Sequence, residues 1–135
     1  MSFHEPMDEA AVNAMSSLAL AHVGDGVYEL MVRTKLAREG GLRQDTLHRA
    51  AVRYVSAVAQ AKAAAHILPM LDAAERGVYT RARNAHSHSS PAGCTPAQYH
   101  AATGLEALFG RLWLTGKIER LQALFAACME GINAS

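Results

Sequence analysis

The stretch LALAHVGDGVYELMV, residues 18–32, has the apolar pattern of a buried helix. Placed on a helix at about 100° per residue, it has one continuous apolar face, formed by Leu20, Val23, Val27, Leu30 and Met31. Asp25 lies on the other side of this helix, where its neighbours are also mostly apolar. A helix that is apolar on two sides is buried on both sides. In so small a domain, we expect another chain to cover the second side.

Asp25 and its flanking glycines are unusual inside such a helix. An ionised carboxylate among apolar groups is costly unless it is paired or binds a cation. Gly24 and Gly26 each cost about 1 kcal/mol relative to alanine in a helix interior, and they leave room for another group to approach the backbone. A helix cap or a structural salt bridge accounts for one buried aspartate at least as well as a functional role does. Asp25 alone therefore does not identify a site.

A second acid, Glu106, has a similar placement in QYHAATGLEALFGRLWL, residues 98–114. It lies on an apolar helix face and again has glycines nearby, Gly104 and Gly110. Two acids on separate helices can converge on one site. Without Cys or His at metal-ligand spacing, two carboxylates favour a hard cation such as Mg²⁺, with Mn²⁺ as a substitute. The chemistry that fits this site is phosphoryl transfer to water.

Length and composition predict one helical domain. The chain has 135 residues, half of them apolar, which is enough for a single core. Helix-favouring residues are plentiful and aromatic residues are few. We therefore predict an all-α fold with one domain over residues 1–135, in which residues 1–12 form an irregular lead-in.

Capping residues and helix breakers divide the chain into five expected helices. Asn13, Ser16 or Ser17 caps the first, which runs to about residue 38, where a Gly-Gly pair ends it. Asp45 is the expected N-cap of the second, and Pro69 ends or bends it. The Ser- and His-rich loop 86–94 precedes a Thr-Pro helix start. The remaining expected helices cover residues 45–67, 72–84, 96–114 and 117–132.

Charge and cysteine content limit the class of protein. The formal net charge is +1, so a nucleic-acid ligand would need a local basic cluster and not a global field. Cys94 and Cys128 do not make a disulfide framework. The N-terminus does not resemble a signal peptide, and no apolar run is long enough to span a bilayer. We expect a cytoplasmic protein with no membrane partner.

Several separated motifs carry a family resemblance. HVGDGVYELMVR (22–33) resembles the signature helix of ribonuclease III catalytic domains, and GLEALFGRLWLTG (104–116) resembles that family's second acidic motif. Three further stretches point to one branch of this family. They are LHRAAVRYVSAVAQA (47–61), RARNAHSHSSP (81–91) and the longer run 99–121. Together they resemble Mini-ribonuclease III, the short bacterial branch that lacks a double-stranded-RNA-binding domain.

The resemblance implies an all-helical homodimer, paired through the signature helices, that cleaves double-stranded RNA with Mg²⁺. It also implies maturation of the large-subunit (23S) ribosomal RNA precursor, with 5′-phosphate products. By position, Asp25 and Glu106 would be the essential catalytic and metal-binding acids. Two further acids of full-length ribonucleases III fall on Ala21 and Thr103 here, a departure that resembles the Mini branch.

Candidate RNA contacts gather at the end of the third expected helix and in the loop after it. A-form RNA is recognised mostly through phosphates and 2′-hydroxyls, to which polar and basic side chains donate. The candidate donors are Arg81, Arg83, Asn84, His86, Ser87 and His88. Arg49 and Arg53 either add phosphate contacts or form a solvated helix face, and His22 is either a hydrogen-bonding neighbour of Asp25 or a packing residue.

Three functional hypotheses follow from these residues. The leading one is a dimeric, metal-dependent, double-strand-specific endoribonuclease. An alternative is a ribonuclease III-like module that binds RNA without cleaving it, which replacement of either acid would favour, and both acids are present. A plain helical interaction protein predicts no carboxylate on an apolar face. Specificity would come from the shape of the RNA or from a ribosomal protein that presents it, and the sequence leaves both open.

Overall fold

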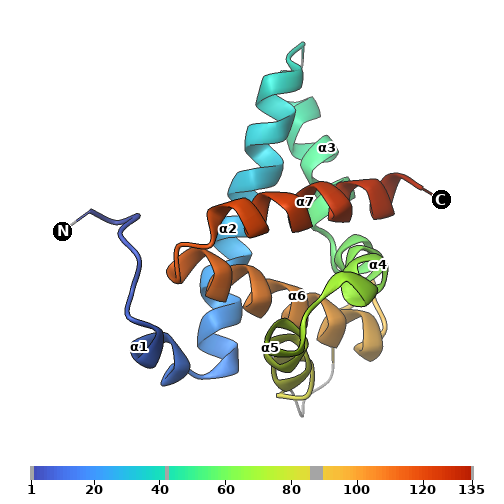
Figure 1. Cartoon of the computed structure of the whole chain (residues 1–135). Coiled ribbons are helices and arrows are strands. Elements are labelled where there is room, and N and C mark those ends of the chain that lie inside the picture. The colour runs from blue at the N-terminus through green and yellow to red at the C-terminus, as the bar shows by residue number, and fades with distance from the viewer. Residues whose placement is uncertain (1, 42, 86–89, 135) are drawn as a thin grey trace.

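The computed structural model describes residues 2–41, 43–85 and 90–134. This part of the chain contains seven α-helices, one short 3-10 helix and no strand (Figure 1). In chain order they are α1 (Glu9–Asn13), α2 (Ser17–Glu39), α3 (Gln44–Val55), α4 (Ala57–Ile67), η1 (Leu68–Met70), α5 (Ala73–Arg83), α6 (Pro96–Leu114) and α7 (Ile118–Asn133). The all-α prediction is confirmed. Within these ranges, no helix has both the length and the apolarity that a bilayer crossing requires.

Helix α6 is at the centre of the bundle. It packs against α2, α4, α5 and α7 (Figure 1). From Ala102 to Leu112, all of its side chains except those of Glu106 and Arg111 are buried. A helix that is apolar nearly all round needs neighbours on every side. Glu106 is therefore an acid on the most enclosed helix of the fold.

Helix α2 buries one of its two apolar sides within the chain. The buried side is a row at intervals of three and four residues, formed by Leu20, Ala21, Gly24, Tyr28, Val32 and Leu36. On the other side, Val23, Val27 and Met31 are only partly buried, and Leu30 is 62% exposed. The side with Leu30 is thus only partly covered within the chain.

Two glycines let α2 and α6 cross at backbone contact. A Cβ atom on Gly24 would lie 1.5 Å from the carbonyl oxygen of Glu106, and one on Gly110 would lie 2.2 Å from that of Leu20. The expected approach to the backbone beside Asp25 is therefore confirmed at Gly24, and the approaching group is α6 itself. The same expectation is wrong at Gly26 within this chain, because nothing lies within 4 Å of its Cβ position.

The expected second helix over residues 45–67 is in fact two helices, α3 and α4. Ser56 breaks it by taking an extended conformation (ψ 154°), and its hydroxyl accepts a hydrogen bond from Ala59 N at 3.2 Å. Serine side chains offer the backbone this alternative to a continuous helix. The Asp45 N-cap prediction is also wrong. The N-cap is Arg43, and Asp45 lies in the first turn, where its carboxylate accepts from Thr46 N.

The remaining helix ends are close to the predicted positions. Ser16 caps α2, and Asp72 and Thr95 each form a reciprocal capping box at the start of α5 and α6. Gly40 ends α2 with a φ of 74°, a conformation that favours glycine. The lead-in over residues 1–12 is not wholly irregular, because the short helix α1 begins within it.

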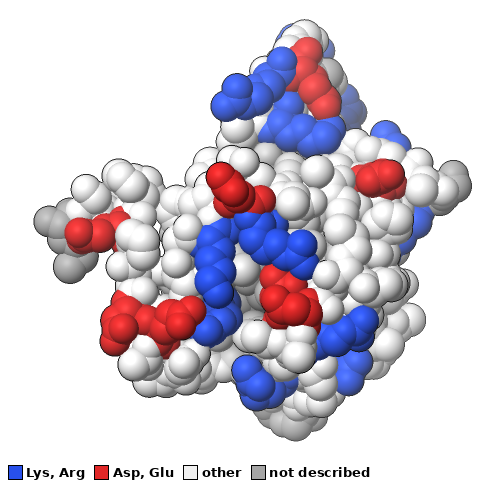
Figure 2. All heavy atoms as spheres, viewed as in Figure 1, with Lys and Arg blue, Asp and Glu red and all other residues white. Residues whose placement is uncertain are grey.

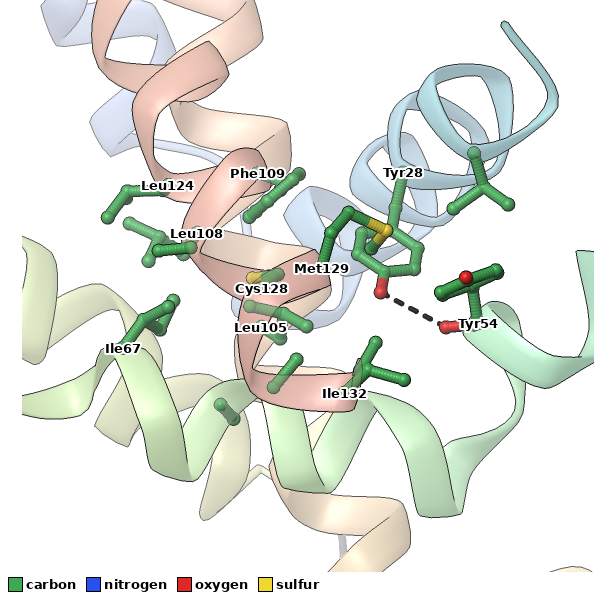
Figure 3. Packing of buried hydrophobic residues seen from close by; sticks show 14 of the residues in the cluster. Tyr28, Tyr54, Ile67, Leu105, Leu108, Phe109, Leu124, Cys128, Met129 and Ile132 are labelled. Carbon is green, nitrogen blue, oxygen red and sulfur yellow. Dashed lines mark hydrogen bonds between the residues drawn. The ribbon is translucent and has the colours of Figure 1, made fainter. Parts of the chain in front are cut away.

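An aromatic contact fixes α2 against α6 one turn beyond the two acids. Tyr28 and Phe109 meet edge to face with ring centroids 5.4 Å apart, and the Tyr28 hydroxyl donates to the carbonyl oxygen of Tyr54 at 3.0 Å (Figure 3). Tyr28 follows Asp25 by three residues, and Phe109 follows Glu106 by three. The same core therefore holds both acid-bearing segments in register.

Candidate active site

The Asp25 and Glu106 carboxyl groups meet where α2 crosses α6. Gly24, the residue before Asp25, contacts the backbone of Glu106 directly. The two carboxyl groups are close enough to share a side-chain hydrogen bond. Asp25 is exposed and Glu106 is partly buried. One acid thus borders the site from the solvent side and the other from the protein side.

The pKa of Glu106 is raised to about 8, chiefly because burial penalises its charged form. The negative charge of Asp25 and the hydrogen bond with Asp25 act in the same direction, and a hydrogen bond from Gln60 opposes them. Without a cation, Glu106 therefore keeps its proton at neutral pH. A cation between the acids would replace that proton, because it stabilises the charged form of both carboxylates.

The donor set fits a hard divalent cation. Carboxylate oxygens are the ligands that such cations prefer, and Mg²⁺ commonly takes one or two carboxylates together with waters and phosphate oxygens. Among the described residues, no group of three or more His, Cys, Asp or Glu side chains is arranged to hold a metal. The site therefore offers two acids. Mg²⁺ can bind such a site with substrate oxygens completing its shell.

The two positions where full-length ribonucleases III have further acids are packing positions here. Ala21 is buried in a small cluster with Val78, Ala82 and other apolar side chains. Thr103 is buried, and its hydroxyl donates to the carbonyl oxygen of Tyr99 at 3.1 Å. An added carboxylate would be enclosed at either position. The reduction to two acids therefore agrees with the local packing.

Gln60 is a third polar side chain at the site, and the sequence analysis missed it. It is 3% exposed, and its Nε2 lies 3.5 Å from Glu106 Oε2. The signal in the sequence was a glutamine in register with Ala63, Ala64 and Ile67 on the buried side of an alanine-rich helix. A polar residue on such a face needs a partner, but the sequence does not say which one.

The candidate RNA contacts are only partly within the described residues. Arg81 and Arg83 lie exposed in the last turn of α5, and Asn84 is its C-cap. Arg83 lies over the Tyr79 ring at 5.8 Å. A Cβ atom on Gly104 would lie 2.7 Å from that same ring. This end of α5 is therefore pressed against α6 two residues before Glu106. The predicted contacts His86, Ser87 and His88 lie outside the described residues.

The three other side chains whose roles the sequence left open, Arg53, Arg49 and His22, differ in their surroundings. Arg53 donates to Asn133 Oδ1 at 3.3 Å and lies 5.6 Å from the Tyr54 ring, so it joins α3 to α7. Arg49 and His22 are exposed. On the face drawn in Figure 2, basic and acidic side chains alternate and no uniformly basic surface forms. This mixed face agrees with the low net charge.

Comparison with known proteins decides the family. The model of the ribonuclease III domain matches residues 18–117. The chain is 45% identical over 116 residues to Mini-ribonuclease 3 of Symbiobacterium thermophilum, an alignment that covers 86% of this chain and 89% of the relative. The chain belongs to the Mini-ribonuclease III family. A Thermoanaerobacter Mini-ribonuclease 3 is 37% identical over 129 residues, with 96% and 91% covered.

A solved structure supports the fold of this Mini-ribonuclease III family member. It is a crystal structure of a Fusobacterium nucleatum protein that is 30% identical, with a TM-score of 0.79, and the match covers 89% of this chain and 96% of that one. The resemblance stated from the motifs is confirmed. Membership makes the chain a ribonuclease III-type endoribonuclease, a class that generally depends on divalent metal. Both acids and Gln60 lie within the matched domain.

Proposed function

We propose that this Mini-ribonuclease III family member cleaves double-stranded RNA at the Asp25–Glu106 site with Mg²⁺, and that its substrate is the 23S ribosomal RNA precursor. The observation that supports this most is the meeting of two carboxyl groups from separate helices, one of them with a pKa raised to about 8. An acid pair that served only stability would be expected to have a basic partner. A pair of acids that holds a cation binds it more tightly when no basic side chain compensates its negative charge.

The roles of the two acids follow from their burial. Asp25, on the exposed side, binds the cation where RNA can reach it, and Glu106 binds it from the protein side. When bound, Mg²⁺ lowers the pKa of a coordinated water and neutralises charge on the scissile phosphate. Attack by water on phosphorus, with the 3′-oxygen leaving, gives products with a 5′-phosphate and a 3′-hydroxyl.

The basic end of α5 is part of the proposed RNA-binding surface. Arg81, Arg83 and Asn84 are exposed donors on a segment pressed against α6 near Glu106. They would contact phosphates and 2′-hydroxyls of A-form RNA, together with His86, Ser87 and His88, which follow in the sequence. With so few basic residues, we expect modest affinity that falls as salt rises. A ribosomal protein that presents the RNA would compensate for this weakness.

A second copy of the chain is the proposed cover for the exposed side of α2. That side borders an apolar groove of about 400 Å³ with Val23, Leu30, Trp113 and Ile118 among its lining residues. Phe3, itself 85% exposed, lines the same groove and packs its ring on Trp113 at 6.1 Å. Pairing through this face would bury these side chains. It would also place two acid sites in one symmetric dimer, one for each strand of a duplex.

Incubation with a duplex RNA tests the proposed reaction. We expect cleavage with Mg²⁺ or Mn²⁺, none with chelator, and none of a single-stranded RNA of the same sequence. Asp25→Asn should abolish cleavage and keep the circular dichroism of the wild type, whereas Asp45→Asn, at an exposed acid on α3, should cleave normally. RNA binding by the wild type without metal-dependent cleavage would favour the non-cleaving module. Processing of a 23S precursor transcript, followed by mapping of its 5′ ends, tests the substrate.

A further inference from the structure

Gln60 is a polar side chain beside Glu106 that the proposed reaction does not use. It lies in the first turn of α4 and is 3% exposed. Its Nε2 donates to the carbonyl oxygen of Val55 at 2.9 Å and, more weakly, to Glu106 Oε2 at 3.5 Å. The side chain therefore joins the end of α3 to the buried acid of α6.

The break at Ser56 sets the orientation of the Gln60 amide. In a continuous helix, Ala59 N–H would donate to the carbonyl oxygen of Val55, but here it donates to Ser56 Oγ. The Gln60 NH₂ group supplies the donor that the Val55 carbonyl has lost. A flipped amide would face that carbonyl with an oxygen, which cannot donate. The oxygen Oε1 must therefore point to the other side.

Gln60 Oε1 is buried, and it has no hydrogen-bond partner within the described ranges. Such an orphaned acceptor is costly, and a natural protein rarely leaves one without a reason. Once a cation is bound, both carboxylates are ionised and cannot donate to Oε1, but a water can. Mg²⁺ usually keeps several waters when it binds to one or two carboxylates. An acceptor on the same amide group whose Nε2 lies 3.5 Å from Glu106 Oε2 is suited to orient one of those waters.

We propose that Gln60 is a positioning residue of the cation site, with Nε2 holding the Glu106 carboxylate and Oε1 accepting a hydrogen bond from a water that the divalent cation retains. The inference rests on the proposed function, because it requires Asp25 and Glu106 to bind the cation. Groups that orient metal ligands from outside the coordination shell typically change metal affinity or activity by about 10- to 100-fold.

Mn²⁺ binding to the full chain without RNA, measured by calorimetry, tests this role. We expect Gln60→Met, which keeps the volume and removes both polar ends, to bind Mn²⁺ about tenfold more weakly than the wild type. Gln44→Met, the same change at an exposed position of α3, should bind as the wild type does. A lower melting temperature for Gln60→Met with unchanged Mn²⁺ affinity would show a structural role only and overturn the inference.

The Asp25→Asn variant separates this inference from the proposed function. If Asp25→Asn loses Mn²⁺ binding and Gln60→Met keeps it, the inference alone fails. If Asp25→Asn binds Mn²⁺ as the wild type does, the proposed cation site fails, and the role of Gln60 fails with it. Should Gln60→Met not fold, a wild-type crystal grown with Mn²⁺ decides. A water bonded to both the ion and Gln60 Oε1 supports the role, and an Oε1 remote from every water of the ion overturns it.

Discussion

The α-carbon of Gly24 rests against the carbonyl oxygen of Glu106, so closely that a Cβ atom would lie 1.5 Å from that oxygen. Gly24 immediately precedes Asp25 on α2, and Glu106 is the acid on α6. This backbone contact therefore brings the segments that carry the two acids together. Packing of α2 against α6 in the core therefore also assembles the candidate active site.

Gly24→Ala should destabilise the protein and abolish cleavage, because the added methyl group meets backbone that cannot move aside without parting the helices. Overpacking of this kind costs about 1–3 kcal/mol or more. Thermal unfolding, followed by circular dichroism, measures it. Gly77→Ala is the matched control, since its methyl group would meet mainly the flexible end of Arg81 at 3.1 Å. That variant should be as stable as the wild type or more so, by up to about 1 kcal/mol. Equal stability of the Gly24 and Gly77 variants would contradict the close crossing.

Without metal, Glu106→Gln should stabilise the protein at high pH. The pKa of Glu106 in the folded protein, about 8, lies above its ordinary 4.5. Between these values the folded protein holds a proton that the unfolded chain has released. Stability therefore falls as pH rises through this window, and the cost is complete above about pH 8.

The variant removes that cost, so its melting temperature should match the wild type near about pH 4 and exceed it near about pH 9 by roughly 10–20 °C. Glu119→Gln, on the exposed first turn of α7, is the control and should show no such trend. Added Mn²⁺ should stabilise the wild type and leave Glu106→Gln nearly unchanged. A variant that is less stable than the wild type at about pH 9 would rule out the unfavourable burial of this acid.

Leu30→Glu should separate the proposed dimer without unfolding the chain. Leu30 is 62% exposed in one chain, so a charge there is tolerated, but it would be buried in a partner interface. Light scattering after size exclusion gives the mass of each species. Val58→Glu, at a 45% exposed apolar residue of α4, should remain dimeric. If Leu30→Glu has the mass of a dimer, the two chains pair through some other face.

Arg120→Met should destabilise the contact between α5 and α7. Arg120 donates to both carboxylate oxygens of Glu75 at 2.8 Å and to the carbonyl oxygen of Met70 at 2.8 Å. Loss of these bonds leaves the nearly buried Glu75 unpaired, which we expect to cost about 2 kcal/mol. Denaturant unfolding of the variant measures this. Arg43→Met, which removes an exposed ion pair with Asp45, should cost less than about 0.5 kcal/mol.

The Arg120–Glu75 pair should make the protein less stable as pH falls, which is the opposite pH dependence to that expected from Glu106. Hydrogen bonds from Arg120 hold the pKa of Glu75 below its ordinary 4.5. The stabilising contribution is therefore full above about pH 4.5 and is lost as pH falls through the lower folded pKa. The stability difference between wild type and Arg120→Met should shrink in acid. A difference that stays constant down to about pH 2 would show that the ion pair contributes nothing.

The acid-bearing helices could be predicted from the sequence because their signals are local. Periodicity placed Glu106 on an apolar face, where it is partly buried, and Ser16 and Thr95 are strong caps. Asp25, which was expected among apolar side chains, is exposed instead. The break at Ser56 could not be predicted, because serine is also common inside helices and only the bond to Ala59 N shows its role. Such side-chain bonds depend on the tertiary fold.

Long-range contacts explain the other differences. Gly24 and Gly26 look alike in the sequence, but only Gly24 faces the backbone of α6. In the sequence, Gln60 looks like any other helix residue. Its role depends on α6, which places Glu106 against it. Local patterns therefore indicated which helices carry the two acids. The partners of each side chain depend on how α2, α4 and α6 pack.

Asp25 and Glu106 are proposed to hold together the divalent cation used for RNA cleavage. Anomalous diffraction from a crystal of the protein grown with Mn²⁺ tests this proposal. We predict an anomalous peak in contact with carboxylate oxygens of both residues, and no peak at this place in Asp25→Asn crystals grown in the same way. A wild-type map with Mn²⁺ bound elsewhere and nothing between these two carboxylates would contradict the account.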